Sequence, residues 1–192
     1  MRAIVMPALL LTVLAGSATA EQNPAAIRHS IARAAARQVG VTTRYDPAYV
    51  RLAYPNGDVP LGRGVCADVI VRAFRAIGVD LQMEIHEDMR RNFAAYPHGW
   101  GLAAPDRNID HRRVPNLMRY FERRSKRVAA EAPYEPGDII AWRLPGGLYH
   151  IGIAAEDNVP GKGRPYMIHN IGAGARREDI LHSFAIIGHY RW

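Results

Sequence analysis

Hydrophobic residues between about residue 24 and residue 121 recur at the spacing of amphipathic helices. In one segment Val69, Ala73, Phe74 and Ile77 lie three or four residues apart, and Gly78 follows where a helix commonly ends. An Asn23-Pro24 pair opens an earlier segment of this kind, and Asp80 is placed to cap a later one. The pattern predicts four helices, which cover about residues 24–38, 66–77, 81–93 and 114–121.

The spacing of hydrophobic residues changes from a helical to a strand-like repeat in the last third of the chain. Short segments rich in isoleucine and aromatic residues alternate with glycine-rich turns, as in successive antiparallel strands. The predicted strands are Ile139–Leu144, Tyr149–Ala155, Tyr166–Ile171 and Phe184–Trp192. Helices followed by strands, without regular alternation, indicate an α+β fold in which a helical layer covers an antiparallel sheet.

The first twenty residues have the pattern of an export signal. Ile4–Ala15 form an apolar stretch, and Ser17–Ala20 end in the small residues of a cleavage site. An apolar stretch of this length is too short to cross a membrane, which takes about 20 residues in a helix. We therefore expect a signal peptide over residues 1–20, a single domain over residues 21–192, no stable membrane insertion, and a periplasmic or secreted product.

The amino-acid composition argues against several classes of function and site. The 25 Lys and Arg residues against 18 Asp and Glu leave a net charge of +7, but no run of five like charges occurs, so we do not expect nucleic-acid binding. Cys66 is the single cysteine, which excludes an internal disulfide framework and a multi-cysteine metal site. We expect no cofactor and no bound metal.

Cys66 follows a glycine-bearing loop and begins a predicted helix. The free N–H groups and the positive end of the helix dipole at such a position favour a thiolate, and the same N–H groups can stabilise an oxyanion. Cys66 is thus a candidate nucleophile with a lowered thiol pKa. The alternative is a small buried apolar residue, a common place for cysteine.

A nucleophilic cysteine needs a base, and His150 and His169 are the two histidines inside predicted strands. Neighbouring strands can place both on one face, so that His150 accepts the thiol proton and His169 orients its ring. Alternatively, each is a strand histidine satisfied by hydrogen bonds. The other histidines show no partner in the sequence (His29, His86, His98, His182) or stay undecided (His111, His189).

Two adjacent arginines, Arg112 and Arg113, precede the fourth predicted helix. They could bind substrate carboxylates through bidentate hydrogen bonds. Equally, Asp110 could cap the helix while one arginine forms a buried ion pair with Asp68 or Asp138. Asp138 itself is expected to be structural, because Pro-Gly-Asp is a turn that begins a strand.

Several short motifs together resemble the exported bacterial domain-of-unknown-function family 1287, over about residues 27–192. The motifs are Gly64–Val69, His86–Met89, Asn108–Leu117, Pro136–Ile139, His150–Gly152 and Ile168–Gly172. More distantly, the sequence is similar to the NlpC-type clan of papain-like cysteine peptidases. The similarity lies in the order of four features: a cysteine at a helix start, Pro-Gly-Asp before a strand, His-Ile-Gly on a strand and a second histidine on the next strand. Val65 and Ala67-Asp68 depart from the Asp-Cys-Ser-Gly pattern usual around the nucleophile of that clan.

This resemblance implies a papain-like fold with a helical insertion near residues 80–127. It also implies Cys66 as nucleophile, His150 as base, His169 as orienting residue and Tyr54 lining the site, with cell-wall stem peptides as substrates. An exported cysteine peptidase or amidase of peptidoglycan is the expected function. The alternatives are a zinc site built on Cys66, His150 and His169, a binding protein without catalysis, and an acyltransferase on the same scaffold.

Overall fold

The computed structural model describes residues 23–129 and 131–192. The expected signal peptide, residues 1–20, lies outside the described residues. Among the residues that are described, no helix is both long and apolar enough to cross a membrane.

The four predicted helices are present. They are α1 (Pro24–Ala36), α2 (Cys66–Arg75), α3 (Leu81–Asn92) and α4 (Val114–Arg123), with short 3₁₀ turns η1 (Phe93–Ala95), η2 (Asp110–Arg112) and η3 (Pro145–Gly147). Asp80 caps α3 as predicted, since its carboxylate accepts the N–H of Gln82 at 3.0 Å. Gly78, at φ 78°, ends the turn after α2 in a left-handed conformation that favours glycine.

Five antiparallel strands form the sheet, in the order β6-β5-β4-β3-β7. The strands β3 (Ile139–Arg143), β4 (Tyr149–Asn158), β5 (Pro165–Asn170) and β7 (Ala185–Tyr190) confirm the four predicted segments, and β6 is Ala175–Glu178. The sequence did not predict β6 because an edge strand with three charged residues has no apolar alternation. A parallel pair of two-residue strands, β1 (Arg44–Tyr45) and β2 (Arg63–Gly64), was also missed.

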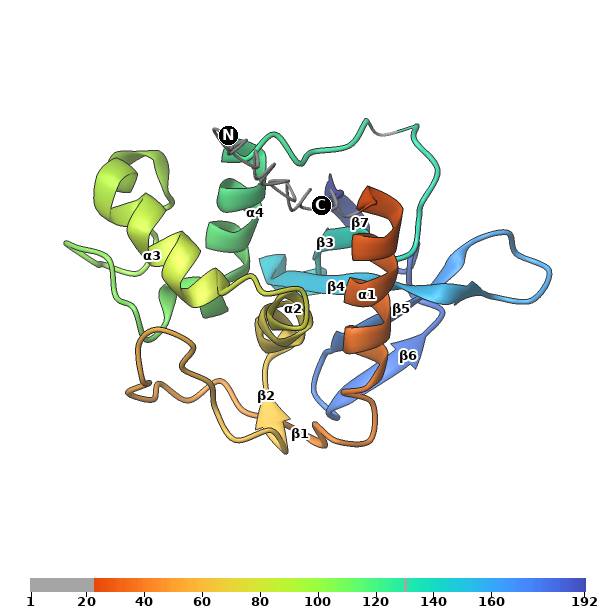
Figure 1. The fold of residues 1–192 in the computed structure, drawn as a ribbon, viewed down its shortest axis with the longest axis horizontal. Helices are drawn as coiled ribbons and strands as arrows, with labels where there is room; N and C mark the ends of the chain where they lie inside the picture. Colours follow the sequence, from red (N-terminus) through yellow and green to blue (C-terminus); the bar gives the residue numbers. More distant parts are fainter. Residues whose placement is uncertain (1–22, 130) are drawn as a thin grey trace, which may run out of the picture.

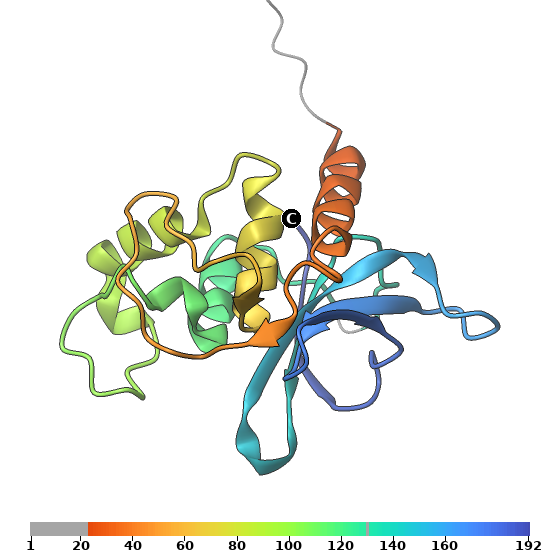
Figure 2. The ribbon, with the colours of Figure 1, turned by 90° about the horizontal axis from the view of Figure 1, so that it is seen from below.

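The helices cover one face of the sheet (Figures 1 and 2), which confirms the α+β fold. Ile151 and Ile153 of β4 point toward this layer and pack in one core with α2, α3 and α4. The other face carries a smaller core in which Trp142 and Met167 pack with Leu181. Alternation along each strand therefore decides which of the two cores a side chain joins.

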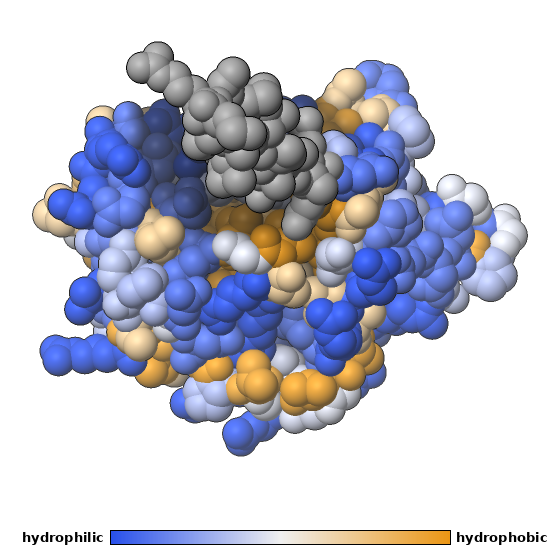
Figure 3. Space-filling view, viewed as in Figure 1, coloured by the Kyte–Doolittle hydropathy of each residue, from blue (hydrophilic) through white to orange (hydrophobic). Residues whose placement is uncertain are grey.

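The outer surface of the helical side is largely hydrophilic (Figure 3). Apolar surface follows the edge where β1 and β2 lie, and exposed large apolar residues of that segment are Val39, Val41 and Leu61.

A buried ion pair holds the beginning of α2. The carboxylate of Asp68 accepts from Arg112 Nε at 2.9 Å and Nη2 at 3.0 Å, and it also accepts the N–H of Val65 at 2.6 Å. Both charged side chains are at most 3% exposed. A Cβ atom at Gly64 would lie 2.8 Å from Asp68 Oδ2, so only glycine leaves room for this carboxylate. Of the pairings predicted for the adjacent arginines, the structure contains Arg112 with Asp68.

Replacing Asp68 with alanine should lower the free energy of unfolding by about 3–5 kcal/mol, because Arg112 is left as an uncompensated buried charge. Urea titration of the purified protein measures this change. The matched control is Arg127→Ala, which breaks an exposed ion pair with Glu122 and should change stability by about 1 kcal/mol or less. Equal losses in the two variants would contradict a dominant role for the buried pair.

Candidate active site

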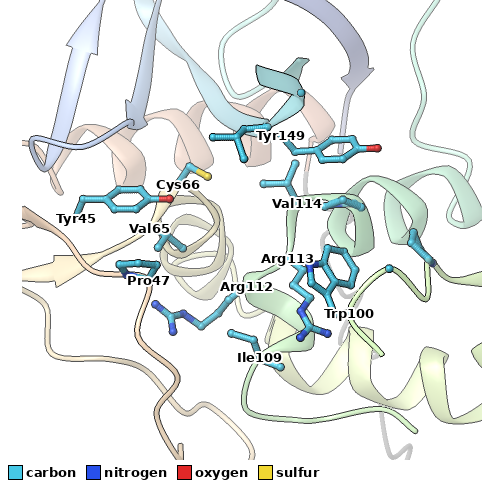
Figure 4. Close-up of a pocket in the computed structure, with 15 residues that line it drawn as sticks. Tyr45, Pro47, Val65, Cys66, Trp100, Ile109, Arg112, Arg113, Val114 and Tyr149 are labelled. Carbon is cyan, nitrogen blue, oxygen red and sulfur yellow. The ribbon is translucent and has the colours of Figure 1, made fainter. Parts of the chain in front are cut away.

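Cys66 is the first residue of α2 and lines a cavity of about 510 Å³ between the helical segment and the β3–β4 turn (Figure 4). In Figure 4, Cys66 and Tyr45 lie on one side of this cavity, and Trp100 with Arg113 lies on the other. The remaining lining residues are Pro47, Val65, Pro97, Gly99, Ile109, Arg112, Val114, Pro115, Gly147, Leu148 and Tyr149.

The tyrosine beside the thiol is Tyr45, so the expectation for Tyr54 is wrong. Tyr45 of β1 pairs with Gly64 of β2, two residues before Cys66. Burial raises the pKa of the Tyr45 phenol, and the nearby Cys66 adds to that shift. Tyr54 instead donates to Glu87 on α3 at 3.0 Å and is not among the lining residues, because its loop packs on α3.

The thiol is nearly inaccessible, with 5% of Cys66 exposed. Burial raises the pKa of the Cys66 thiol to about 12, although the N–H groups of Ile151, Ala67 and Cys66 itself oppose the shift. The expected lowering of the thiol pKa is therefore wrong for this conformation. Desolvation of the thiolate outweighs the N–H groups at the helix start. The thiol is neutral at pH 7.

His150 and His169 meet as predicted, with Nε2 of His150 3.0 Å from Nδ1 of His169. The ring of His150 also stacks on Trp142 at a centroid distance of 5.6 Å, which fixes its orientation. Burial lowers the pKa of His150 to about 3, and the neighbouring His169 adds to that shift. Nδ1 of His150 has no hydrogen-bond partner within the described residues and is not fully buried. A neutral imidazole with one free nitrogen can act as a base.

The thiol and the imidazole approach β4 from its two faces. His150 and Trp142 are cross-strand partners on the face opposite α2, whereas Cys66 belongs to the core on the helical side. The N–H that lowers the thiol pKa comes from Ile151, the residue after His150. Pairing between β4 and β5 ends at Gly152 and His169, so the next residue, Ile151, has no partner residue on β5. In the part of the chain described, no hydrogen bond joins Cys66 to His150. Of the predicted Cys-His-His relay, the structure therefore contains only the contact between His150 and His169 among the described residues.

The two adjacent arginines have different roles. Arg112 uses four of its five N–H donors on Asp68 and on the carbonyls of Ala48 and Asp46, so its main role is structural, and one Nη1–H remains for the predicted substrate contact. Arg113 stacks on Trp100 at 4.4 Å, and its Nη1 is buried without a hydrogen-bond partner.

Asp110 does not cap α4. It begins η2 and accepts the N–H of Asp106, and its Oδ1 lies 3.8 Å from Arg113 Nη1. Burial raises the pKa of the Asp110 carboxyl to about 6, so Asp110 loses its charge toward Arg113 as the pH falls below about 6.

Asp138 is structural, as expected. It is fully buried and accepts from His189 at 2.7 Å and from Arg191 at 2.8 Å. Two histidines expected to lack partners have them: His29 contacts Glu156, and His98 contacts the carbonyl of Phe93.

Two further residues support the site, and the sequence did not predict the first of them. Glu178 Oε2 lies 3.0 Å from Nε2 of His169, but Glu178 belongs to the unpredicted strand β6. Asn170 is fully buried and donates to the carbonyl of Gly64 at 2.9 Å, tying β5 to the loop before Cys66. Within residues 23–129 and 131–192, no group of three or more His, Cys, Asp or Glu side chains is arranged to hold a metal ion. The alternative zinc set of Cys66, His150 and His169 is thus not brought together.

Comparison with known proteins gives one family and one relative. A family model described as a domain of unknown function, DUF1287, matches residues 32–192. The uncharacterized protein YijF of Escherichia coli (strain K12) is 54% identical over 166 residues, which cover 85% of this chain and 80% of that protein. No solved structure matches the chain.

The raised thiol pKa predicts slow alkylation of the folded protein. At pH 8 iodoacetamide should label native Cys66 at least about 100-fold more slowly than the urea-unfolded chain, because a far smaller fraction is thiolate. The folded state holds this proton more tightly than the unfolded chain, so the contribution of Cys66 to the free energy of unfolding falls as pH rises from about 9 toward 12. A native labelling rate that levels off below pH 8 would contradict the raised pKa.

Proposed function

The chain belongs to the DUF1287 family, and we propose that it is an exported cysteine hydrolase that cleaves a peptide or amide bond in the stem peptides of the bacterial cell wall. The observation that carries this proposal is Cys66 itself. It stands at the first residue of a helix, on the wall of a cavity, with backbone N–H groups around its sulfur. This arrangement suits a nucleophile whose oxyanion needs donors.

A papain-like fold of the NlpC type agrees with the order of the elements. The cysteine-bearing helix α2 packs on the antiparallel sheet, and two successive strands of that sheet supply the histidines. The segment from α3 to α4 is the expected helical insertion, and it contributes Trp100 and Arg113 to the cavity. Substrate selection is therefore assigned to this segment, and the chemistry to the helix and sheet.

Both partners of the proton transfer are neutral before reaction, because burial raises the pKa of the Cys66 thiol and lowers the pKa of His150. We therefore assign general-base catalysis in place of a preformed thiolate–imidazolium pair. Because the thiol and His150 approach β4 from opposite faces, the proposal requires a rearrangement in the substrate complex that brings the thiol within reach of Nδ1 of His150. We place this rearrangement at the edge of β4 beyond the Gly152–His169 pair, where β5 no longer pairs with β4.

The reaction then proceeds in two steps. In the first, the sulfur of Cys66 bonds to the substrate carbonyl carbon while His150 takes the thiol proton, and N–H groups at the start of α2 stabilise the oxyanion. The C–N bond breaks as His150 returns the proton to the leaving amine, which leaves a thioester. In the second, His150 takes a proton from water, the hydroxide attacks the thioester carbonyl, and the proton returns to the sulfur as the acid leaves.

Arg113 is the residue that would recognise a substrate carboxylate. Its guanidinium lies over the ring of Trp100 at 4.4 Å, and Nη1 lacks a hydrogen-bond partner among the described residues. Arg113 lines the same cavity as Cys66. Stem peptides carry free carboxylates, and the positive net charge of the chain favours such anionic substrates.

Digestion of purified peptidoglycan tests the function. The protein should release fragments with new amino and carboxyl termini, and both Cys66→Ala and His150→Ala should lower kcat by about 10³-fold or more. Circular dichroism and urea titration confirm that the variants fold, and EDTA should leave the rate unchanged. The proposal fails if Cys66→Ala retains wild-type turnover, or if activity is lost on chelation and restored by zinc.

Removing the Arg113 guanidinium should weaken binding of carboxylate-bearing peptides. Arg113→Met should raise KM by about 10- to 100-fold, the loss expected for a hydrogen bond to a charged group, with little change in kcat. The same peptide with that carboxylate amidated should show little difference between variant and wild type. The matched control is Arg119→Met, which removes an arginine of α4 that does not line the cavity. An equal effect on both peptides would contradict the assignment.

A further inference from the structure

Glu178 stands next to the pair of histidines, on the strand that ends the sheet. Strand β6 pairs with β5, so that Met167 faces Glu178 and His169 faces Arg176 across the ladder. Diagonal neighbours on one face are within reach of long side chains, and Oε2 of Glu178 lies 3.0 Å from Nε2 of His169. At this distance Nε2 of His169 is buried and makes no hydrogen bond within the described part of the chain, but Glu178 is 40% exposed, so its carboxylate can turn to accept one.

A carboxylate can only accept a hydrogen bond, and this dictates where His169 carries its proton. The contact favours the proton on Nε2, which leaves Nδ1 of neutral His169 as an acceptor. Arg176, directly opposite His169, can only donate and so cannot take this role. Glu178 is therefore the side chain of β6 that can select the tautomer of His169.

The tautomer of His169 determines the tautomer of His150, because Nε2 of His150 lies 3.0 Å from Nδ1 of His169. When Nδ1 of His169 is the acceptor, Nε2 of His150 must be the donor. Neutral His150 then has no proton on Nδ1. In the opposite arrangement, His169 would donate from Nδ1, and His150 would carry its proton on Nδ1 and could not act as a base there.

We propose that Glu178 is a positioning residue that fixes the tautomers of both histidines and so leaves a lone pair on Nδ1 of His150. The consequence for catalysis rests on the proposed hydrolase function, but the tautomers themselves do not. Glu178 touches neither the cavity nor Cys66 among the described contacts, so it acts only through His169.

Nitrogen NMR of protein labelled with ¹⁵N-histidine reads the tautomers directly, because protonated and unprotonated ring nitrogens have distinct shifts and couplings. In the wild type both His150 and His169 should carry their protons on Nε2. Glu178→Ala should move part of the population of both rings to the Nδ1–H form. Glu178→Gln should keep the wild-type pattern, because an amide oxygen also accepts from Nε2–H.

The matched control is Glu156→Ala. Glu156 has the same 40% exposure and lies at the same 3.0 Å from a histidine nitrogen, but its partner is His29 on α1. This variant should leave the signals of His150 and His169 unchanged. Since both glutamates are half-exposed, a general loss of structure would show in the spectra of both variants.

The kinetic readout on peptidoglycan complements the spectra. Glu178→Ala should lower kcat by about 10- to 100-fold with KM nearly unchanged, and Glu178→Gln should recover most of that loss. A wild-type His150 with its proton on Nδ1, or tautomers unaffected by Glu178→Ala, overturns the inference. Tautomers as expected in a protein that hydrolyses nothing would overturn the proposed function and leave the role of Glu178 standing.

Discussion

The buried pair of Asp68 and Arg112 is the constraint on which the site depends. It joins the third residue of α2 to η2, and through further hydrogen bonds from Arg112 it reaches the carbonyls of Asp46 and Ala48. The same carboxylate caps the N–H of Val65, so the backbone just before Cys66 has one conformation. Three segments far apart in the sequence thus meet next to Cys66, and they line the cavity.

This arrangement buries the reacting groups, and burial decides their charge. The N–H groups and dipole at a helix start contribute about 0.3–1 kcal/mol toward a thiolate. With these N–H groups already acting, the thiol pKa is still raised from 9.0 to about 12, a net effect on the order of 4 kcal/mol against the thiolate. Desolvation therefore outweighs the helix start and keeps the thiol neutral, and burial also lowers the pKa of His150 on the other face of β4. These two neutral groups support the general-base reaction proposed above.

The sheet separates the two halves of that chemistry. Alternation along β4 sends His150 to the face of Trp142, while Ile151 turns to the helical core and its N–H approaches the sulfur. One strand thus touches both the thiol and the base through consecutive residues. Asn170 and Glu178 support this edge from β5 and β6, one through the loop before α2 and the other through His169.

The sequence by itself determined the helices and four of the strands, because the spacing of apolar residues within each short segment is enough to predict it. It also determined that Cys66 begins a helix and that His150 and His169 meet, since both follow from short-range spacing and strand pairing. Only the tertiary structure decided that Arg112 pairs with Asp68 while Arg113 lies over Trp100, because Asp68 is on α2, far from both arginines in the sequence. It alone placed Tyr45 beside the thiol in place of Tyr54, and Glu178 beside His169, since two-residue and edge strands have no apolar pattern. Desolvation of Cys66 was also decided by the tertiary structure. It depends on which residues pack around the sulfur, and the residue spacing near Cys66 does not predict them.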